Sequence, residues 1–295
     1  MNNYMDNDLK IHNHTDGTLY ADIIHKNTIS KILRYGTFDN NPRGKYKSDE
    51  GKAYSKFITQ NFEQYDINNG QFPITTLRPI AVKSAIKEMF WIFQDQSNDI
   101  SLLKEKYNVN YWDDWDIGNG TIGNRYGSTV KKYNLVNNLI NGLKNDPFSR
   151  RHIISLWQED EFSSSSGLVP CAFLTLWSVR EVKGTKFLDL TLIQRSNDYI
   201  VSGHINMMQY VALQMMVAHT VGMKVGIFSR LTQNIHIYTR HIDDAVELLR
   251  REPSKKQPKL ILDAKDKSFY DITIDDFSLI DYEPIKPQLY FDLAI

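Results

Sequence analysis

The chain has 295 residues, of which 41% are hydrophobic and 24% charged, the balance of an ordinary soluble globular protein. Lysine plus arginine equals aspartate plus glutamate at 35 each. This zero net charge argues against a protein built mainly to hold nucleic acid, because such proteins usually carry a basic surplus. The single cysteine, Cys171, excludes an intramolecular disulfide, and no Cys/His spacing resembles a zinc site.

No segment of the sequence resembles a membrane span or an export signal. The N-terminal MNNYMDNDLKIHN is polar and mixed in charge, unlike a secretory signal. The most apolar stretch, Met207 to Gly222, is interrupted by glutamine and histidine and is too short to cross a bilayer. We therefore expect a protein of the reducing cytoplasm that has no membrane partner.

Residue spacing predicts two loops, two helices and a strand before Cys171. Residues 37–55 are polar, glycine-containing and basic, which predicts a mobile loop. Residues 80–94 repeat apolar side chains at helical spacing, and residues 135–143 form a similar stripe that stops at Asp146-Pro147. Residues 152–157 are a strand candidate, and the serine run 163–166 predicts a short surface loop.

The second half combines a hairpin, a buried helix and further strands. Residues 172–182 and 186–194 read as a hairpin around Lys183-Gly184-Thr185, and residues 206–221 are apolar nearly all round, which predicts a central buried helix. Strand candidates at 227–238 and 288–293 flank a helix expected over 242–251. Without strict βαβ alternation or a linker, this order predicts an α+β fold, a single domain over 1–295 with a mixed, mostly antiparallel sheet packed against helices.

The predicted hairpin brings Cys171 and Arg195 together. If its strands pair across the turn, Arg195 lies near the start of the first strand and so near Cys171. A lone cysteine is most often an inert small hydrophobe, and a lone arginine is usually a surface ion pair. A guanidinium beside a thiol, however, stabilises the reactive thiolate.

Several further polar residues have both a structural and a functional interpretation. Asn206 stands at the head of the predicted buried helix, where asparagine is usually a cap, but an amide can also accept from a uracil N3–H while donating to the adjacent carbonyl. His236 and Tyr238 alternate on a strand and point to one face, either as core residues or as ligand contacts. Arg150-Arg151 is ordinarily a solvated pair, and Glu88 in a helix is ordinarily salt-bridged or solvated.

Taken together, these residues resemble the thymidylate synthase family over nearly the whole chain, in the version found in low-GC bacteria and their phages. The matching motifs are the Pro-Cys segment Leu168 to Cys171, Gln194 to Asp198, Asn206 eleven residues after Arg195, His236-x-Tyr238 with His241, Trp112 to Trp115, and Gly123 to Gly127.

The resemblance implies dUMP as substrate and assigns a role to each residue that binds it. Cys171 adds to C6 of the uracil, and Asn206 pairs with the edge of the base. The remaining contacts are Arg43, Arg195 and Ser196 to the 5′-phosphate, with Arg150 and Arg151 from the neighbouring subunit of a homodimer, and His236 and Tyr238 to the ribose 3′-hydroxyl.

The resemblance also implies 5,10-methylenetetrahydrofolate as co-substrate, with no metal. Asp198 would hydrogen-bond to the pterin, Trp112, Trp115 and Leu168 would wall its pocket, and the tail ending in Ala294-Ile295 would close the site. Glu88 would organise water for proton transfer at C5 and O4, assisted by Tyr126, and burial should raise its pKa. The expected products are dTMP and dihydrofolate.

Three other functions compete with this interpretation. A pyrimidine-nucleotide hydroxymethylase of the same fold would use the same cysteine adduct and folate but add water instead of hydride. Asparagine at position 206 argues for uracil over cytosine, which leaves a dUMP hydroxymethylase as the nearest rival. A nucleic-acid-binding regulator without catalysis is opposed by the zero net charge, and a cysteine hydrolase by the lack of a recognisable hydrolase motif.

Overall fold

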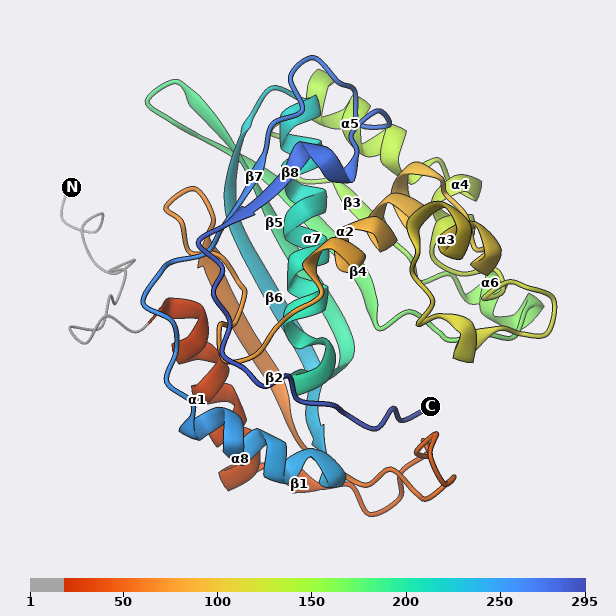
Figure 1. Cartoon of the computed structure of the whole chain (residues 1–295). Coiled ribbons are helices and arrows are strands. Elements are labelled where there is room, and N and C mark those ends of the chain that lie inside the picture. The colour runs from red at the N-terminus through yellow and green to blue at the C-terminus, as the bar shows by residue number, and fades with distance from the viewer. Residues whose placement is uncertain (1–18) are drawn as a thin grey trace.

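A six-stranded sheet forms the centre of the computed structural model, which describes residues 19–295 (Figure 1). Its strand order is β1-β2-β6-β5-β4-β3, and every pair is antiparallel except β5 with β6. A second sheet pairs β7 with β8. The strands are β1 Thr37–Phe38, β2 Ser55–Asp66, β3 Ile153–Ser155, β4 Ala172–Val182, β5 Thr185–Asp198, β6 Lys224–Tyr238, β7 Lys259–Leu262 and β8 Phe277–Ile280.

Helix α7, Tyr199–Thr220, packs along the sheet against β5 and β6. Its side chains are apolar on nearly every face, so the helix is buried along most of its length. Helix α2, Val82–Met89, packs against α7 and continues as a π-helix, Phe90–Gln94, a local widening that is frequent near functional sites. The other α-helices are α1 Tyr20–Tyr35, α3 Ile100–Tyr107, α4 Gly127–Lys132, α5 Leu135–Asn145, α6 Glu159–Ser164 and α8 Ile242–Arg250.

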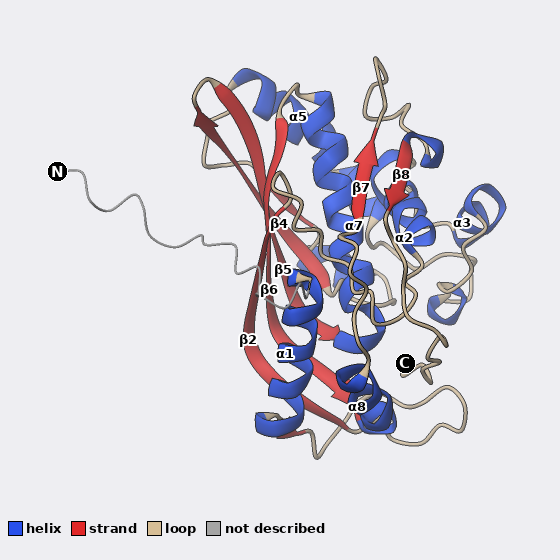
Figure 2. Cartoon of the chain, turned by 60° about the vertical axis from the view of Figure 1, so that its left-hand side comes forward, coloured by secondary structure: helices blue, strands red, loops and turns tan. Residues whose placement is uncertain are grey.

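The two faces of the main sheet differ. Figure 2 shows the helices gathered on one side of the sheet, and within residues 19–295 no helix covers the other side. On the uncovered side the strand register aligns Phe62, Leu231, Ile193 and Leu174 across four strands, and Ile153 lies opposite Leu176 at the edge. We call Phe62, Leu231, Ile193, Leu174, Leu176 and Ile153 the outer apolar band.

Most of the predicted elements are confirmed. The α+β class, the mostly antiparallel sheet, the hairpin of β4 and β5, the buried helix and the helices near 80–94, 135–145 and 242–250 are all present. No helix among the described residues is long and apolar enough to cross a membrane. The expectation for the N-terminal segment, and the first part of the predicted 1–295 domain, fall on residues 1–18, outside the described residues.

Five details of the prediction were wrong. Residues 37–55 are not wholly a loop, because Thr37–Phe38 form β1 and Ser55 begins β2. Residues 288–293 form no strand, because the tail pairs only through an isolated bridge between Tyr46 and Ala294. The serine run is not wholly a loop, since Ser163 and Ser164 belong to α6. The hairpin turn is shorter than expected, with Thr185 already in β5, which runs on to Asp198. The buried helix starts at Tyr199, so Asn206 lies within it and caps nothing.

Candidate active site

Cys171 lies immediately before β4, where the hairpin register joins it to Arg195. Ala172 pairs with Gln194, and the Arg195 backbone N–H donates to the Cys171 carbonyl at 2.9 Å. The Arg195 side chain folds back on the same segment, with Nε donating to the Pro170 carbonyl at 3.0 Å and Nη2 to the Val169 carbonyl at 2.7 Å. The predicted proximity of cysteine and guanidinium is confirmed, and Arg195 also fixes the chain that carries the thiol.

The pKa of the Cys171 thiol is raised above its ordinary value, because burial outweighs the nearby positive charges. The Arg195 and Arg43 guanidiniums act in the opposite direction and favour the thiolate. The direction expected for Arg195 is therefore confirmed, and burial, which the sequence argument did not consider, acts against it and is the larger effect. The structure also brings the charge of Arg43, from the predicted loop, into range of the thiol.

The segment that carries Arg43 is paired with the C-terminal tail. The Lys45 N–H donates to the Ile295 carbonyl at 2.9 Å, and the Ile295 N–H donates to the Lys45 carbonyl at 2.8 Å. Arg240 ties both segments together: its Nη2 lies 2.7 Å from Asp49 of the loop and its Nη1 lies 2.8 Å from Asp292 of the tail. Residues 43–52 and 291–295 therefore form one unit, which we call the rim.

Polar side chains meet where β5 and β6 end side by side. Asp198 is the register partner of His236, and the rings of His236 and Tyr238 are 4.9 Å apart, which confirms that they share a face. Burial lowers the pKa of His236 to about 4, so its imidazole is neutral, and its Nε2 has no hydrogen-bond partner. Burial raises the pKa of Asp198 to about 7, and its Oδ1 is likewise unpartnered.

Asn206 belongs to a hydrogen-bond network that reaches from β5 to α2. Its Oδ1 accepts from Gln194 Nε2 and from Asn197 Nδ2, each at 3.0 Å, and its Nδ2 donates to Gln209 Oε1 at 3.0 Å. Gln209 Nε2 in turn donates to Glu88 Oε2 at 2.7 Å. A single chain of side-chain contacts thus links Asn206 to the buried carboxyl of α2.

Glu88 is buried, and burial raises its pKa to about 6, the direction predicted from the sequence. Hydrogen bonds from Tyr111 and Gln209 lower the pKa and offset part of that rise, and the indole of Trp112 acts in the same sense. The Tyr111 hydroxyl donates to the same Oε2 that accepts from Gln209. A carboxyl with this pKa can both take up and release a proton near neutral pH.

Tyr126 is brought beside Cys171 by two close backbone approaches. A Cβ at Gly127 would overlap the Ser97 carbonyl oxygen, and one at Gly123 would overlap that of Ser166, so both positions require glycine. Burial, followed by the charge of Cys171, raises the pKa of Tyr126 well above its usual value, so its hydroxyl stays protonated.

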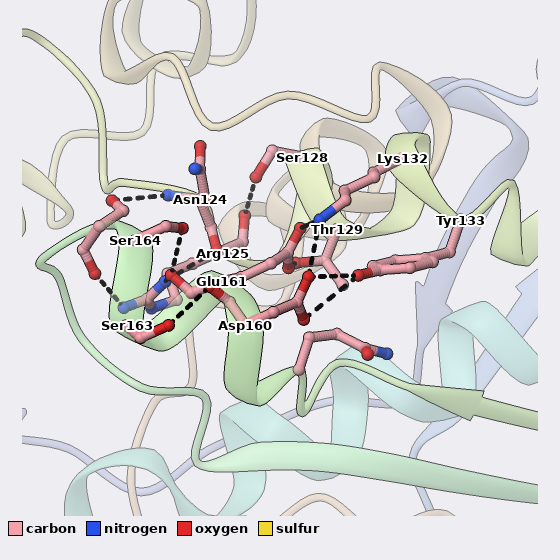
Figure 3. A network of polar contacts seen from close by, with 12 residues as sticks. Asn124, Arg125, Ser128, Thr129, Lys132, Tyr133, Asp160, Glu161, Ser163 and Ser164 are labelled. Atoms are coloured by element: carbon pink, nitrogen blue, oxygen red, sulfur yellow. Dashed lines mark hydrogen bonds and ion pairs between the residues drawn. The ribbon is translucent and has the colours of Figure 1, made fainter.

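A polar network fastens the segment around Tyr126 to α6 (Figure 3). Arg125 Nη1 donates to the Glu161 carbonyl at 2.9 Å, and Thr129 Oγ1 donates to the Glu161 carboxylate at 2.5 Å. Lys132 adds an exposed pair with Asp160 at 3.2 Å. These contacts explain how the short helix α4 is held in place although it has only six residues.

The predicted cofactor wall is aromatic. Trp112 contacts Trp115 and Tyr126 with ring centroids 5.4 and 5.3 Å apart, and Trp115 and Leu168 are partly buried against the same core. Trp112 Nε1 is buried without a hydrogen-bond partner. This wall lies close to Glu88, since Trp112 contributes to the pKa of that residue.

Two predicted residues do not join this site within the chain. Arg150 and Arg151 are exposed in the connection between α5 and β3. The neighbouring His152 carbonyl accepts from the Trp177 N–H at 2.9 Å, and Trp177 lies six residues along β4 from Cys171. At about 3.3 Å per strand residue, that separation is about 20 Å, too far for an arginine side chain of the same chain.

The sequence argument missed Tyr111 and Gln209. Gln209 stands three residues after Asn206 on the same helix, so helical spacing could have placed their side chains together. Tyr111 had no local signal beyond its place beside Trp112. Within residues 19–295, no group of three or more His, Cys, Asp or Glu side chains is arranged to hold a metal ion.

A thiol flanked by guanidiniums, with a neutral histidine and a buried carboxyl of raised pKa nearby, is the arrangement of a cysteine-dependent enzyme that handles a phosphorylated ligand. Comparisons with known proteins identify the family of this enzyme. The family model described as thymidylate synthase matches residues 24–295. Thymidylate synthase of Streptococcus sanguinis is 55% identical over 93% of this chain and 99% of that protein, and the one of Streptococcus suis is 54% identical over the same shares.

The chain belongs to the thymidylate synthase family. The solved structure of thermostable thymidylate synthase A from Bacillus subtilis superposes with a TM-score of 0.86 at 36% identity, covering 94% of this chain and all of that one. The chain is therefore an enzyme, a methyltransferase that forms dTMP from dUMP with methylenetetrahydrofolate as co-substrate. These relatives do not favour the hydroxymethylase alternative.

Proposed function

We propose that Cys171 is the nucleophile of this reaction and adds to C6 of the uracil ring, which makes C5 a carbanion equivalent. The observation that carries the proposal is the position of Cys171 between the Arg195 contacts and the charge of Arg43. Because burial raises the pKa of the thiol, the two guanidiniums supply the stabilisation of the thiolate. The same two arginines, together with Ser196, bind the 5′-phosphate.

Asn206 recognises the uracil base through hydrogen bonds. One N–H of its amide is not used in the network and is available to a uracil carbonyl. To accept the ring N3–H, its Oδ1 has to give up one of two donors, and Asn197 can leave because its Nδ2 also donates to Ser202 at 3.1 Å. The neutral His236 and the hydroxyl of Tyr238 bind the 3′-hydroxyl of the deoxyribose.

Glu88 handles the proton transfers at C5 and O4 through water, and Tyr126 assists from beside the cysteine. The pKa of Glu88, about 6, suits a group that gains and loses a proton within one turnover. No step in this scheme needs a metal ion.

The folate site lies next to these residues. The unpartnered Oδ1 of Asp198 fits an N–H of the pterin, and a hydrogen bond there would satisfy a buried acceptor that is otherwise costly. Trp112, Trp115 and Leu168 form an apolar wall for the ring system, and the tail with Ala294 and Ile295 closes over it as part of the rim.

We further propose that two chains pair through the outer apolar band. Phe62 and Ile153 are 58% and 48% exposed in the isolated chain, and a contiguous apolar surface of this kind marks an interaction site. A two-fold pairing would also give Arg150 and Arg151 a purpose, because they would reach the phosphate of the partner chain. A catalytic thiol stays reduced most readily in a reducing compartment, so we propose the cytoplasm.

Trapping tests the mechanism. Incubation with fluoro-dUMP and methylenetetrahydrofolate should give a covalent ternary adduct, and mass spectrometry should locate it on Cys171. The Cys171→Ser variant should give none. Folded wild-type protein that forms no adduct would refute the mechanism, and size-exclusion chromatography with light scattering tests the dimer separately.

A further inference from the structure

Tyr111 donates a hydrogen bond to Glu88 in the active site, although no catalytic or binding role is assigned to Tyr111. Tyr111 belongs to the connection that follows α3, and 40% of its surface is exposed. Its hydroxyl nevertheless reaches inward and donates to Oε2 of the buried Glu88. A surface side chain thus holds a buried carboxyl that the proposed mechanism uses.

Two donors converge on one oxygen of Glu88. Tyr111 approaches from the connection after α3 and Gln209 from α7, and both donate to Oε2, with Gln209 Nε2 at 2.7 Å. Among residues 19–295, no hydrogen bond of ordinary geometry reaches Oε1, and the buried indole N–H of Trp112 is the one further donor that acts on the carboxyl. Because a carboxyl pinned through one oxygen cannot rotate freely, Oε1 is the oxygen left to exchange protons with water or ligand.

We propose that Tyr111 is a positioning residue for proton transfer, which holds Glu88 through Oε2 and leaves Oε1 as its working oxygen. The proposal rests on the role of Glu88 proposed above. It predicts that loss of the Tyr111 hydroxyl slows the removal of the C5 proton more than it slows the attack by Cys171.

The titratable groups that face Glu88 are all tyrosines. They are Tyr111, Tyr126 before α4 and Tyr210 of α7, and the pKa of each is raised above its usual value. None of these tyrosines ionises near neutral pH. Asp198, whose pKa is raised to about 7, is the other carboxyl of the site, so the Glu88→Gln variant is needed to assign a rate limb near pH 6 to Glu88. Loss of the Tyr111 hydrogen bond removes a contact that favours the carboxylate, and the pKa of Glu88 must then rise.

The test compares Tyr111→Phe with Tyr107→Phe. Tyr107 is a matched control because its hydroxyl also donates to a carboxylate, Asp95 Oδ2 at 2.7 Å, away from Glu88. In Tyr111→Phe we expect kcat at pH 7 to fall about tenfold, with little change in KM for dUMP. The low-pH limb should move up by about one pH unit, so that activity recovers as pH is raised. Tyr107→Phe should leave both unchanged.

A second readout separates proton transfer from nucleophilic attack. Fluoro-dUMP has no proton at C5 to remove, so adduct formation draws on Glu88 only through O4, and Tyr111→Phe should slow the covalent adduct on Cys171 much less than it slows turnover of dUMP. Loss of the adduct would mean that the substitution disrupts the site as a whole, and it would overturn the proposal. A pH profile identical to that of the wild type, or an equal shift in Tyr107→Phe, would also overturn it.

The Glu88→Gln variant tests the role of Glu88 separately from that of Tyr111. If this variant loses the low-pH limb, Glu88 is the titrating group and the Tyr111→Phe result decides the inference. If the limb persists in Glu88→Gln, the proposed role of Glu88 itself fails, whatever Tyr111→Phe does.

Discussion

The two sides of the active site are built by different kinds of contact. The inner side, around Cys171, Arg195 and Asn206, is fixed by the backbone ladder of β4 and β5 and by buried side-chain hydrogen bonds. The rim is held by a few backbone hydrogen bonds and by Arg240, whose side chain is 38% exposed and pairs with Asp49 and Asp292. Buried polar networks are strong when every member is satisfied, whereas exposed ion pairs are weak and screened by salt.

The inner side positions the reacting atoms, and the rim controls access of ligands to them. Atoms that react must be held within fractions of an ångström, and the inner side supplies buried contacts with little freedom. A lid has to open and close on every turnover, and weak exposed pairs make that possible. We therefore expect substitutions on the inner side to have large effects on activity or stability that do not depend on salt. Substitutions at the rim should have small effects that do depend on salt.

The largest effect is expected from Asn206→Asp. A carboxylate can accept from the amino group of cytosine but cannot donate to a uracil carbonyl, so preference should shift from dUMP toward dCMP, by a factor approaching about 10⁴. Because the introduced carboxylate cannot donate to Gln209 either, the contact between Gln209 and Glu88 should loosen and dUMP turnover should fall.

The measurement is kcat/KM for both nucleotides, with the exposed Asn138→Asp on α5 as control. Unchanged selectivity in the Asn206 variant would remove this residue from base reading.

A smaller but still large effect is expected from Glu63→Gln, behind the inner side. Arg230 donates to Glu63 through Nε at 2.7 Å, both side chains are buried, and Arg230 also contacts Gln194 of the Asn206 network at 3.4 Å. Removing the carboxylate leaves a buried charge unpaired, which should lower the free energy of unfolding by about 3–5 kcal/mol.

Urea unfolding at fixed protein concentration checks this value. Glu283→Gln, which breaks the exposed pair with Lys256, is the control and should not move the midpoint measurably. An equal loss in both variants would contradict the distinction between buried and exposed pairs.

The smallest effect is expected at the rim, from Arg240→Ala. Loss of both ion pairs should loosen the segment that carries Arg43 and raise KM for dUMP about two- to fivefold. The wild-type KM should itself rise with salt, and the variant should respond less. A salt response as steep in the variant as in the wild type would show that Arg240 does not control the rim.

Local sequence patterns were sufficient for the elements and contacts that depend on neighbours in the chain. The hairpin spacing placed Arg195 beside Cys171, and strand alternation placed His236 and Tyr238 on one face. Helix α1 was missed because it buries Asp22, His25 and Thr28 together with apolar residues, so it shows no clean apolar stripe. Its buried carboxylate is satisfied by Thr75 and Thr76, which lie far away in the sequence.

The features that could not be predicted from the sequence depend on contacts between residues far apart in the chain. The parallel pairing of β5 with β6, the contact between Tyr111 and Glu88 and the burial that raises the Cys171 pKa all arise from tertiary packing. Residues 288–293 have strand-like alternation, but they find no edge to pair with except at the rim. Spacing alone carries no information about such partners.

Arg195 performs two tasks with one guanidinium, and this has a consequence for poor substrates. Its Nε and Nη2 hold the carbonyls of Pro170 and Val169, directly ahead of the nucleophile, while the group also faces the proposed phosphate site. An anion drawn to that guanidinium therefore sets the position of the sulfur as well. Deoxyuridine, which has the same ring but no phosphate, should be a slow substrate even at saturation, because nothing would bring the thiol and the ring into alignment.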